Sequence, residues 1–124
     1  MAKPTAPEPS IALDTARSDP RLGGTVYFTI PLEGIPTTVK NPRVEVLAYQ
    51  NEQLVYGEAG SVDQATGSGN DSLGYSGFLL GGGSSIWLQQ GGPAHCVANL
   101  FYFGKEKGRE TYEFLATCQF EATG

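Results

Sequence analysis

The sequence has few of the residues on which active sites and metal centres usually depend. It contains one histidine, His95, and two cysteines, Cys96 and Cys118, among 124 residues. A single histidine gives almost no support to Ser-His-Asp or Cys-His catalysis. Two thiols and one imidazole do not complete a tetrahedral zinc site. We therefore expect no enzyme activity, no catalytic residues, no metal ion and no cofactor.

Positive charge and long apolar runs are scarce as well. The chain has 8 Lys and Arg against 13 Asp and Glu, which gives a net charge of -5. A surface that follows nucleic-acid phosphates needs an excess of basic side chains, so we expect no nucleic-acid partner. No apolar run approaches the length of a membrane span, and residues 1–10 lack the apolar core of a signal peptide. We expect a protein that is made in the cytoplasm and has no membrane span.

Apolar and polar residues alternate along much of the chain, which is typical of half-buried β-strands. The clearest case is a long hairpin over residues 94–122. Shorter strands are expected over residues 10–16, 25–32, 43–50, 53–57, 73–80 and 85–89, with turns at many of the 17 glycines and 8 prolines. This pattern predicts one all-β domain over residues 11–124, with about seven or eight strands in two antiparallel sheets.

The alternation also predicts which hairpin side chains face the core: Cys96, Ala98, Leu100, Tyr102, Tyr112, Phe114, Ala116, Cys118 and Phe120. A turn centred on Lys107 would place Cys96 directly opposite Cys118, within disulfide range. We expect a structural cysteine pair. It is either two reduced core thiols, as cytoplasmic synthesis favours, or a disulfide formed late in an extracellular particle. His95 would point to the face opposite Cys96, so the two side chains cannot form a catalytic pair.

Two glycine-rich segments and the N-terminus complete the chain. Residues 67–73 match one copy of a calcium-binding repeat that works only in tandem. We therefore expect a flexible loop around Asp63 and Asp71 and no calcium site. Residues 81–85 lack the lysine of a phosphate-binding loop and predict a turn. Residues 1–10 form an extended arm spaced by Pro4, Pro7 and Pro9, which is either a free tail or a segment that lies on a neighbouring subunit.

The strand order and the spacing of Ala94, Cys96, Ala98, Leu100 and Tyr102 resemble an immunoglobulin-like sandwich over about residues 10–122. The strand over residues 25–32 has no cysteine, and Ala94 stands where a tyrosine corner would be, so the resemblance is to domains outside the antibody lineage. Short domains of this kind with a proline-rich arm resemble the immunoglobulin-like accessory proteins of tailed bacteriophages. The resemblance implies a virion protein of capsid or tail, present in multiple copies and bound to capsid or tail subunits.

Several apolar residues occupy strand positions whose side chains are expected to face solvent. In immunoglobulin-like folds the third, sixth and seventh strands are neighbours, so these residues would gather on one outer sheet face: Leu47, Tyr49, Val97, Phe101, Phe103 and Leu115. Such patches mark interfaces, unless loops or the arm cover them. We predict that this face and the arm dock onto protein partners. The alternative is a carbohydrate- or cell-surface-binding module, in which Trp87, Tyr75 and glycine-rich loops supply stacking aromatics.

Overall fold

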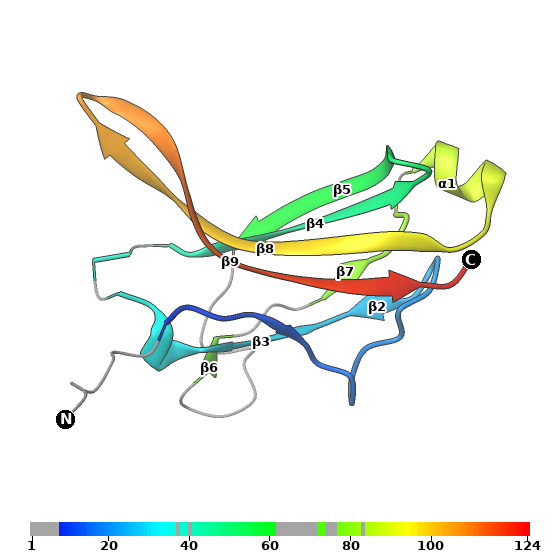
Figure 1. Cartoon of the computed structure of the whole chain (residues 1–124), viewed down its shortest axis with the longest axis horizontal. Helices are drawn as coiled ribbons and strands as arrows, with labels where there is room; N and C mark the ends of the chain where they lie inside the picture. The colour runs from blue at the N-terminus through cyan, green and yellow to red at the C-terminus, as the bar shows by residue number, and fades with distance from the viewer. Residues whose placement is uncertain (1–7, 37, 40, 62–71, 74–76, 83) are drawn as a thin grey trace.

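The computed structural model describes residues 8–36, 38–39, 41–61, 72–73, 77–82 and 84–124. Within these residues the chain is mostly antiparallel β-structure, with one short α-helix and one 3-10 turn (Figure 1). The elements are β1 (Ala12–Leu13), β2 (Thr25–Val26), β3 (Phe28–Pro31), η1 (Leu32–Gly34), β4 (Arg43–Gln50), β5 (Gln53–Ser61), β6 (Ser72–Leu73), β7 (Phe78–Leu79), α1 (Ser85–Gln90), β8 (Ala94–Glu106) and β9 (Arg109–Ala122). None of the helices in the described ranges is long and apolar enough to cross a membrane.

The larger sheet has the strand order β5-β4-β8-β9, and all of its pairings are antiparallel. Buried and less buried residues alternate strictly along β4. Its buried face against the core consists of Val44, Val46 and Ala48, which are fully buried, and the residues between them are not. The third predicted strand therefore lies beside the long hairpin, as the sequence indicates. Asn51 and Glu52, both at positive φ, make the predicted turn into β5.

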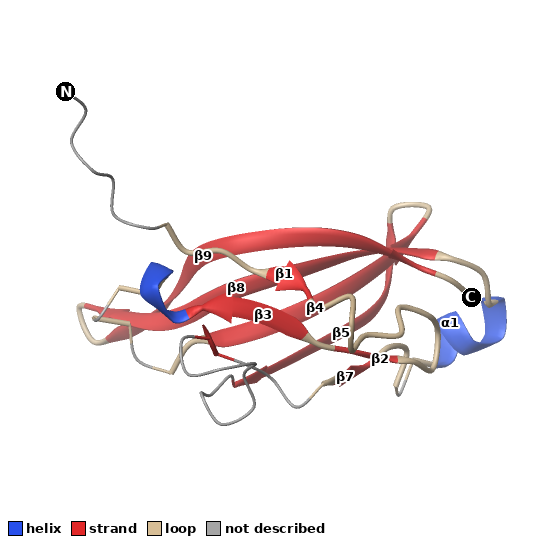
Figure 2. Ribbon diagram, turned by 90° about the horizontal axis from the view of Figure 1, so that it is seen from below, coloured by secondary structure: helices blue, strands red, loops and turns tan. Residues whose placement is uncertain are grey.

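Shorter strands form a second layer across the core (Figures 1 and 2). They pair as β1-β3-β6 and β2-β7. Val26, Phe28 and Ile30 point from this layer into the core, and the ring of Phe28 packs against Phe78 and Phe120 with centroid distances of 6.0 Å. The two layers bury one continuous apolar core, as the predicted all-β class requires.

The segment expected to be a strand over residues 85–89 is a helix instead. The Ser84 hydroxyl accepts the Trp87 backbone N–H at 3.2 Å, and Gly91 ends the helix at a φ of 60°. Trp87 is fully buried, and its Nε1 donates to the Gly92 carbonyl at 3.0 Å. This helix depends on one serine cap and one buried ring. A helix this short is not revealed by the 3.6-residue spacing of apolar residues.

The hairpin turn lies half a residue further along than expected. Glu106 pairs with Arg109, so Lys107 and Gly108 alone form the loop, at φ values of 51° and 80°. Two consecutive positive φ angles indicate a type I′ turn, whose twist matches that of the flanking strands. Strand pairing thus begins immediately beside the loop.

A β-bulge at Leu115 changes the parity of the hairpin. Leu100 pairs with Ala116 but Phe101 pairs with Phe114, so Leu115 has no partner on β8. One extra residue gives the two sides of the bulge opposite alternations. Tyr112 and Phe114, which precede the bulge, are therefore exposed, and their predicted inward positions are wrong. Leu115 was expected on the outer face, but it packs against the core.

Other segments differ from the sequence expectations at their boundaries. β5 continues to Ser61 rather than ending at Gly57. The single strand predicted over residues 73–80 appears as β6 and β7, and residues 74–76 between them lie outside the described residues. Asp63, Asp71 and Tyr75 also lie outside them, as do Pro4 and Pro7.

The described part of the N-terminal segment packs on its own domain. Pro9 is half-buried, and a Cβ placed on Gly34 would meet the Glu8 carbonyl oxygen at 2.5 Å. Gly34 of η1 therefore lets the chain at residues 8–9 pass close by. The part of the predicted arm that contains Pro9 lies against η1.

We predict opposite effects for two turn substitutions. Gly108→Ala should lower the free energy of unfolding by about 1 kcal/mol, because alanine is strained at positive φ. Lys107→Asn should raise it, because asparagine tolerates that region better. Urea titration followed by the fluorescence of the buried Trp87 measures both, with Lys105→Ala as the control outside the turn. Equal midpoints for the two turn variants would contradict a type I′ turn.

Candidate functional site

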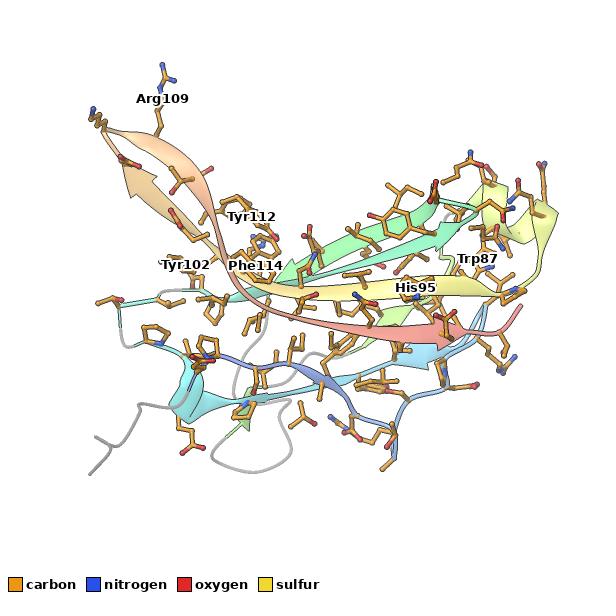
Figure 3. The ribbon with its side chains drawn as sticks, in the orientation of Figure 1. Trp87, His95, Tyr102, Arg109, Tyr112 and Phe114 are labelled. Atoms are coloured by element: carbon orange, nitrogen blue, oxygen red, sulfur yellow. The ribbon has the colours of Figure 1, made fainter. Side chains whose placement is uncertain are left out.

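Four aromatic side chains gather on the outer face of the large sheet, where the β8–β9 hairpin leaves the body. We call Phe101, Phe103, Tyr112 and Phe114 the aromatic cluster. Phe101 pairs with Phe114, and Phe103 pairs with Tyr112, so all four share one face. Figure 3 labels Tyr112 and Phe114 at this bend. The bulge at Leu115 creates the cluster, because without it β9 would turn both of its aromatics toward the core.

The cluster has one buried ring with exposed rings around it. Phe101 is only 3% exposed, because two rings cover it. The ring of Tyr112 stacks on it with a centroid distance of 4.6 Å, and the ring of Phe103 meets it edge-on with a centroid distance of 5.4 Å. Phe103, Tyr112 and Phe114 are 46%, 48% and 56% exposed. The Arg43 guanidinium lies 5.6 Å from the Phe103 centroid and adds a cation–π contact. Contiguous exposed rings of this kind are typical of binding surfaces.

A polar row borders the cluster on the sheet. The Tyr112 hydroxyl donates to Glu45 at 2.8 Å, and Asn99 Nδ2 donates to the same carboxylate oxygen at 3.0 Å. Burial, followed by the hydrogen bond and charge of Glu45, raises the pKa of Tyr112 to about 12. The hydroxyl therefore stays protonated at neutral pH and holds the exposed ring in place.

The predicted interface residues consequently fall into separate groups. Leu47 pairs with Val97 and Tyr49 with His95, all beyond the polar row from the aromatic cluster. Leu47 is half-buried because it lies over Gly57, where a Cβ would meet its Cδ2 at 3.2 Å. Phe103 is exposed as expected, whereas Phe101 is covered and Leu115 faces the core.

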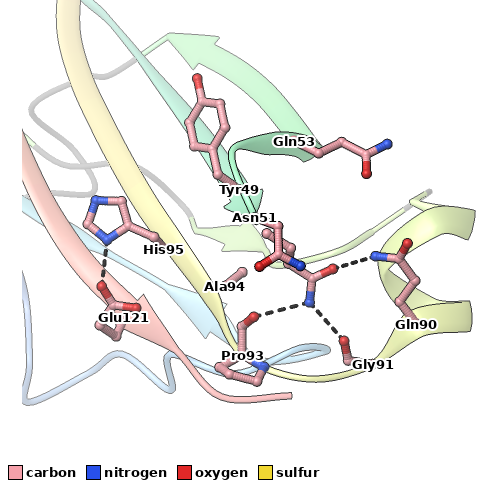
Figure 4. Close-up of a pocket in the computed structure, with 10 residues that line it drawn as sticks. Tyr49, Asn51, Gln53, Gln90, Gly91, Pro93, Ala94, His95 and Glu121 are labelled. Atoms are coloured by element: carbon pink, nitrogen blue, oxygen red, sulfur yellow. Dashed lines mark hydrogen bonds and ion pairs between the residues drawn. The ribbon is translucent and has the colours of Figure 1, made fainter.

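A second candidate site lies at the opposite end of the sheet, beside α1 (Figure 4). This concavity, which we call the end concavity, has a volume of about 560 Å³ and is lined by Tyr49, Gln50, Asn51, Gln53, Gln90, Gly91, Pro93, Ala94, His95 and Glu121. Of these residues Tyr49 was predicted to lie in an interface, and His95 and Ala94 were named for other reasons. The amide side chains come from the β4–β5 turn and α1, and α1 was not predicted.

His95 and Glu121 form an ion pair on one wall of the end concavity. His95 Nδ1 lies 2.5 Å from Glu121 Oε1, on cross-strand partners of β8 and β9. The hydrogen bond that His95 shares with the Glu121 carboxylate raises the pKa of His95. Desolvation opposes this effect, and the charge of Glu121 and a hydrogen bond with Gln119 add to it. The side chain is exposed and points away from Cys96, as the alternation predicted.

Gln50 fixes the loop that closes the end concavity. Its Nε2 donates to the carbonyl oxygens of Gly91 at 2.8 Å and Pro93 at 3.1 Å, and its Oε1 accepts from Gln90 Nε2 at 2.7 Å. A weaker contact of 3.3 Å reaches the Gly92 carbonyl. One side chain thereby joins the end of β4 to the end of α1.

The two cysteines are not opposite each other. Cys96 pairs with Phe120 and Cys118 with Ala98, because the two-residue turn and the bulge shift the hairpin register. Both thiols are free. Burial, with a smaller effect of the Glu121 charge, raises the pKa of Cys96 to about 12, and burial raises that of Cys118 to about 11. The expected direct pairing is wrong. Cys96 is a small apolar residue of the core, and Cys118 packs against the core.

The described positions hold no group of three or more His, Cys, Asp or Glu side chains that could bind a metal ion. Trp87, expected to stack on a ligand, is fully buried.

The sequence did carry one signal for the exposed aromatics. Phe114, Leu115 and Ala116 are three consecutive apolar residues within an alternating strand, and such a run marks a point where the parity of a strand can change. Nothing comparable in the sequence indicates the end concavity, because its lining depends on a helix that the pattern did not predict.

We predict that Glu121→Gln lowers the pKa of His95, measured by titrating its ring resonances by NMR. In the wild-type fold this pKa is raised above 6.5. The ion pair therefore stabilises the fold fully below pH 6.5, and this contribution disappears as the pH rises through the raised pKa. Arg109→Ala is the control for a change elsewhere on β9, because Arg109 is exposed and lies at the ribbon end of that strand. An unchanged His95 pKa in Glu121→Gln would contradict the pairing.

We also predict slow alkylation of both thiols in the folded protein at pH 8, since both raised pKa values leave little thiolate. Half-buried Cys118 should react before fully buried Cys96. Mass spectrometry after timed iodoacetamide treatment measures the order, and urea-unfolded protein is the control. Rapid labelling of Cys96 would show that the hairpin opens.

A scan against protein-family models, a search of curated proteins and a search of solved structures found no match for this chain. What the protein does is therefore inferred from its own side chains.

Proposed function

We propose that the protein is a non-enzymatic structural component that docks onto other proteins in a larger assembly through the aromatic cluster. The observation that carries this proposal is the exposure of Phe103, Tyr112 and Phe114, at 46%, 48% and 56%, around one buried ring. Aromatic residues are enriched at protein interfaces, and rigid aromatic anchors carry much of the binding energy there.

The geometry of the hairpin supports docking. Among the described residues, β8 pairs with β4 only as far as Phe101, and beyond that point β8 and β9 pair with each other alone. The resulting two-stranded ribbon projects away from the body in Figure 1. A two-stranded ribbon is marginally stable in water. A partner that covers its aromatic base would add about 25 cal/mol per Å² of buried apolar surface.

The charge at the ribbon tip supports an assembly of several copies. Lys105, Lys107 and Arg109 stand against Glu106 and Glu110, which gives this tip a net charge of +1 on a chain of net charge -5. The tip of one copy is thus complementary in charge to the acidic body of another. Such complementarity steers association and fixes orientation.

Sheet topology supports the finer assignment of the fold. The order β5-β4-β8-β9 places β4, the third strand predicted from the sequence, beside β8 and thus in one sheet with the last two strands. The corresponding sheet of immunoglobulin-like sandwiches has this order, and β5 is an added edge strand. We therefore propose an immunoglobulin-like sandwich. Its resemblance to accessory proteins of tailed phages makes a virion, at the capsid or the tail, the assembly that we propose.

Exposed members of the cluster provide the test. Phe114→Asp and Phe103→Asp should each abolish co-sedimentation with phage particles while thermal unfolding changes little, because both rings are about half exposed. Leu88→Asp on α1 is the matched control, since Leu88 is 63% exposed and lies far from the ribbon. Phe101→Asp is unsuitable, because it would bury a charge and destabilise the fold.

Normal association of both cluster variants would refute docking through the aromatic cluster. Loss of association in Leu88→Asp as well would assign the effect to general surface charge.

A further inference from the structure

We propose that the end concavity binds one neutral sugar ring. This site is separate from the docking surface, because it lies at the α1 end of the sheet and the ribbon leaves the other end (Figure 1). Trp87, which was first expected to stack on a carbohydrate, does not line it, because Trp87 is fully buried. A different set of side chains carries the inference.

The charges of the lining favour a neutral ligand. The lining contains no Lys or Arg, and its one imidazole and one carboxylate, His95 and Glu121, are paired with each other at 2.5 Å. An anion would meet no free cation there. A hard metal cation needs several oxygen ligands, and the single carboxylate is already engaged.

The hydrogen-bonding capacity of the lining fits a polyhydroxylated ligand. Asn51, Gln53 and Gln90 are exposed, and each amide offers both a donor and an acceptor. Gln90 uses its Nε2 on Gln50, which leaves its Oε1 as an acceptor. For Asn51 and Gln53 no side-chain hydrogen bond is seen within the described part of the chain. Vicinal hydroxyl groups also donate and accept, so they match amides placed side by side.

An apolar surface stands next to these amides. Tyr49 is half-buried and lies between His95 on one side and Gln53 on the other in Figure 4. Pro93 and Ala94 contribute apolar atoms to the lining. A pyranose has one face of C–H groups that packs on such a ring while its hydroxyls reach the amides. The volume of about 560 Å³ falls within the usual range of ligand sites.

The site is held in shape before any ligand arrives. Gln50 binds the carbonyls of the loop after α1, and Trp87 Nε1 holds the Gly92 carbonyl at 3.0 Å. Asn51 adopts a φ of 48°, a conformation that asparagine tolerates better than most residues. The backbone around the site therefore needs little ordering on binding, and pre-organisation of this kind improves affinity.

The test uses the full chain labelled with ¹⁵N and titrated with glucose, galactose, mannose and N-acetylglucosamine at millimolar concentrations. We expect at least one sugar to shift the side-chain amide signals of Gln53 and Gln90 and the ring signals of His95. Tyr49→Ala and Gln53→Ala should each weaken the binding of this sugar by about tenfold. Gln53 is exposed, so its variant keeps the test valid if Tyr49→Ala is unstable.

Two controls separate this site from other effects. Arg109→Ala changes an exposed β9 residue outside the concavity and should leave sugar binding intact. Phe114→Asp should also leave it intact, so that failure of docking and failure of sugar binding are distinguishable.

Three results would overturn the proposal. They are the absence of shifts with all four sugars, shifts confined to residues outside the end concavity, and undiminished binding in both Tyr49→Ala and Gln53→Ala. Shifts produced by a short neutral peptide and by none of the sugars would assign the concavity to peptide recognition instead.

Discussion

The single residue that β9 has in excess of β8 determines the character of both faces of the hairpin. Leu115 has no cross-strand partner. Even-numbered residues therefore face outward before it and toward the core after it. After the bulge, Ala116, Cys118 and Phe120 pack toward the core. Before it, Tyr112 and Phe114 stand on the outer face with Phe101 and Phe103. The register of one strand therefore determines the packing of the core and the composition of the surface at the same time.

Much of the architecture could be predicted, because alternation is a local signal. The strands with Val26, Phe28 and Ile30 and with Val44, Val46 and Ala48 face the core as their pattern indicates. Three features could not be predicted from alternation: the cap of α1 by Ser84, the two-residue turn at Lys107 and Gly108, and the bulge. Each depends on one or two residues, yet the cysteine register and the solvent face of the aromatics follow from them.

The sites differ in how far the sequence could reveal them. Phe103 could be identified by its parity, whereas Tyr112 and Phe114 required knowledge of the bulge. The lining of the end concavity comes from β4, the β4–β5 turn, β5, α1, the loop after α1, β8 and β9. No local pattern brings these segments together. Glu45 and Asn99 separate the two sites on the sheet face. An apolar patch predicted as one surface is therefore divided by a carboxylate that three strands help to position.

Gln50 shows how much geometry one amide can specify. Residues 91–93 belong to no strand or helix, and their carbonyl oxygens turn toward a single side-chain nitrogen. Glutamate has nearly the same shape, but its carboxylate would present negative charge to those oxygens and repel them. The conformation of this loop thus depends on a residue 41 to 43 positions earlier in the chain, and on that residue having an NH₂ group where glutamate has an oxygen atom.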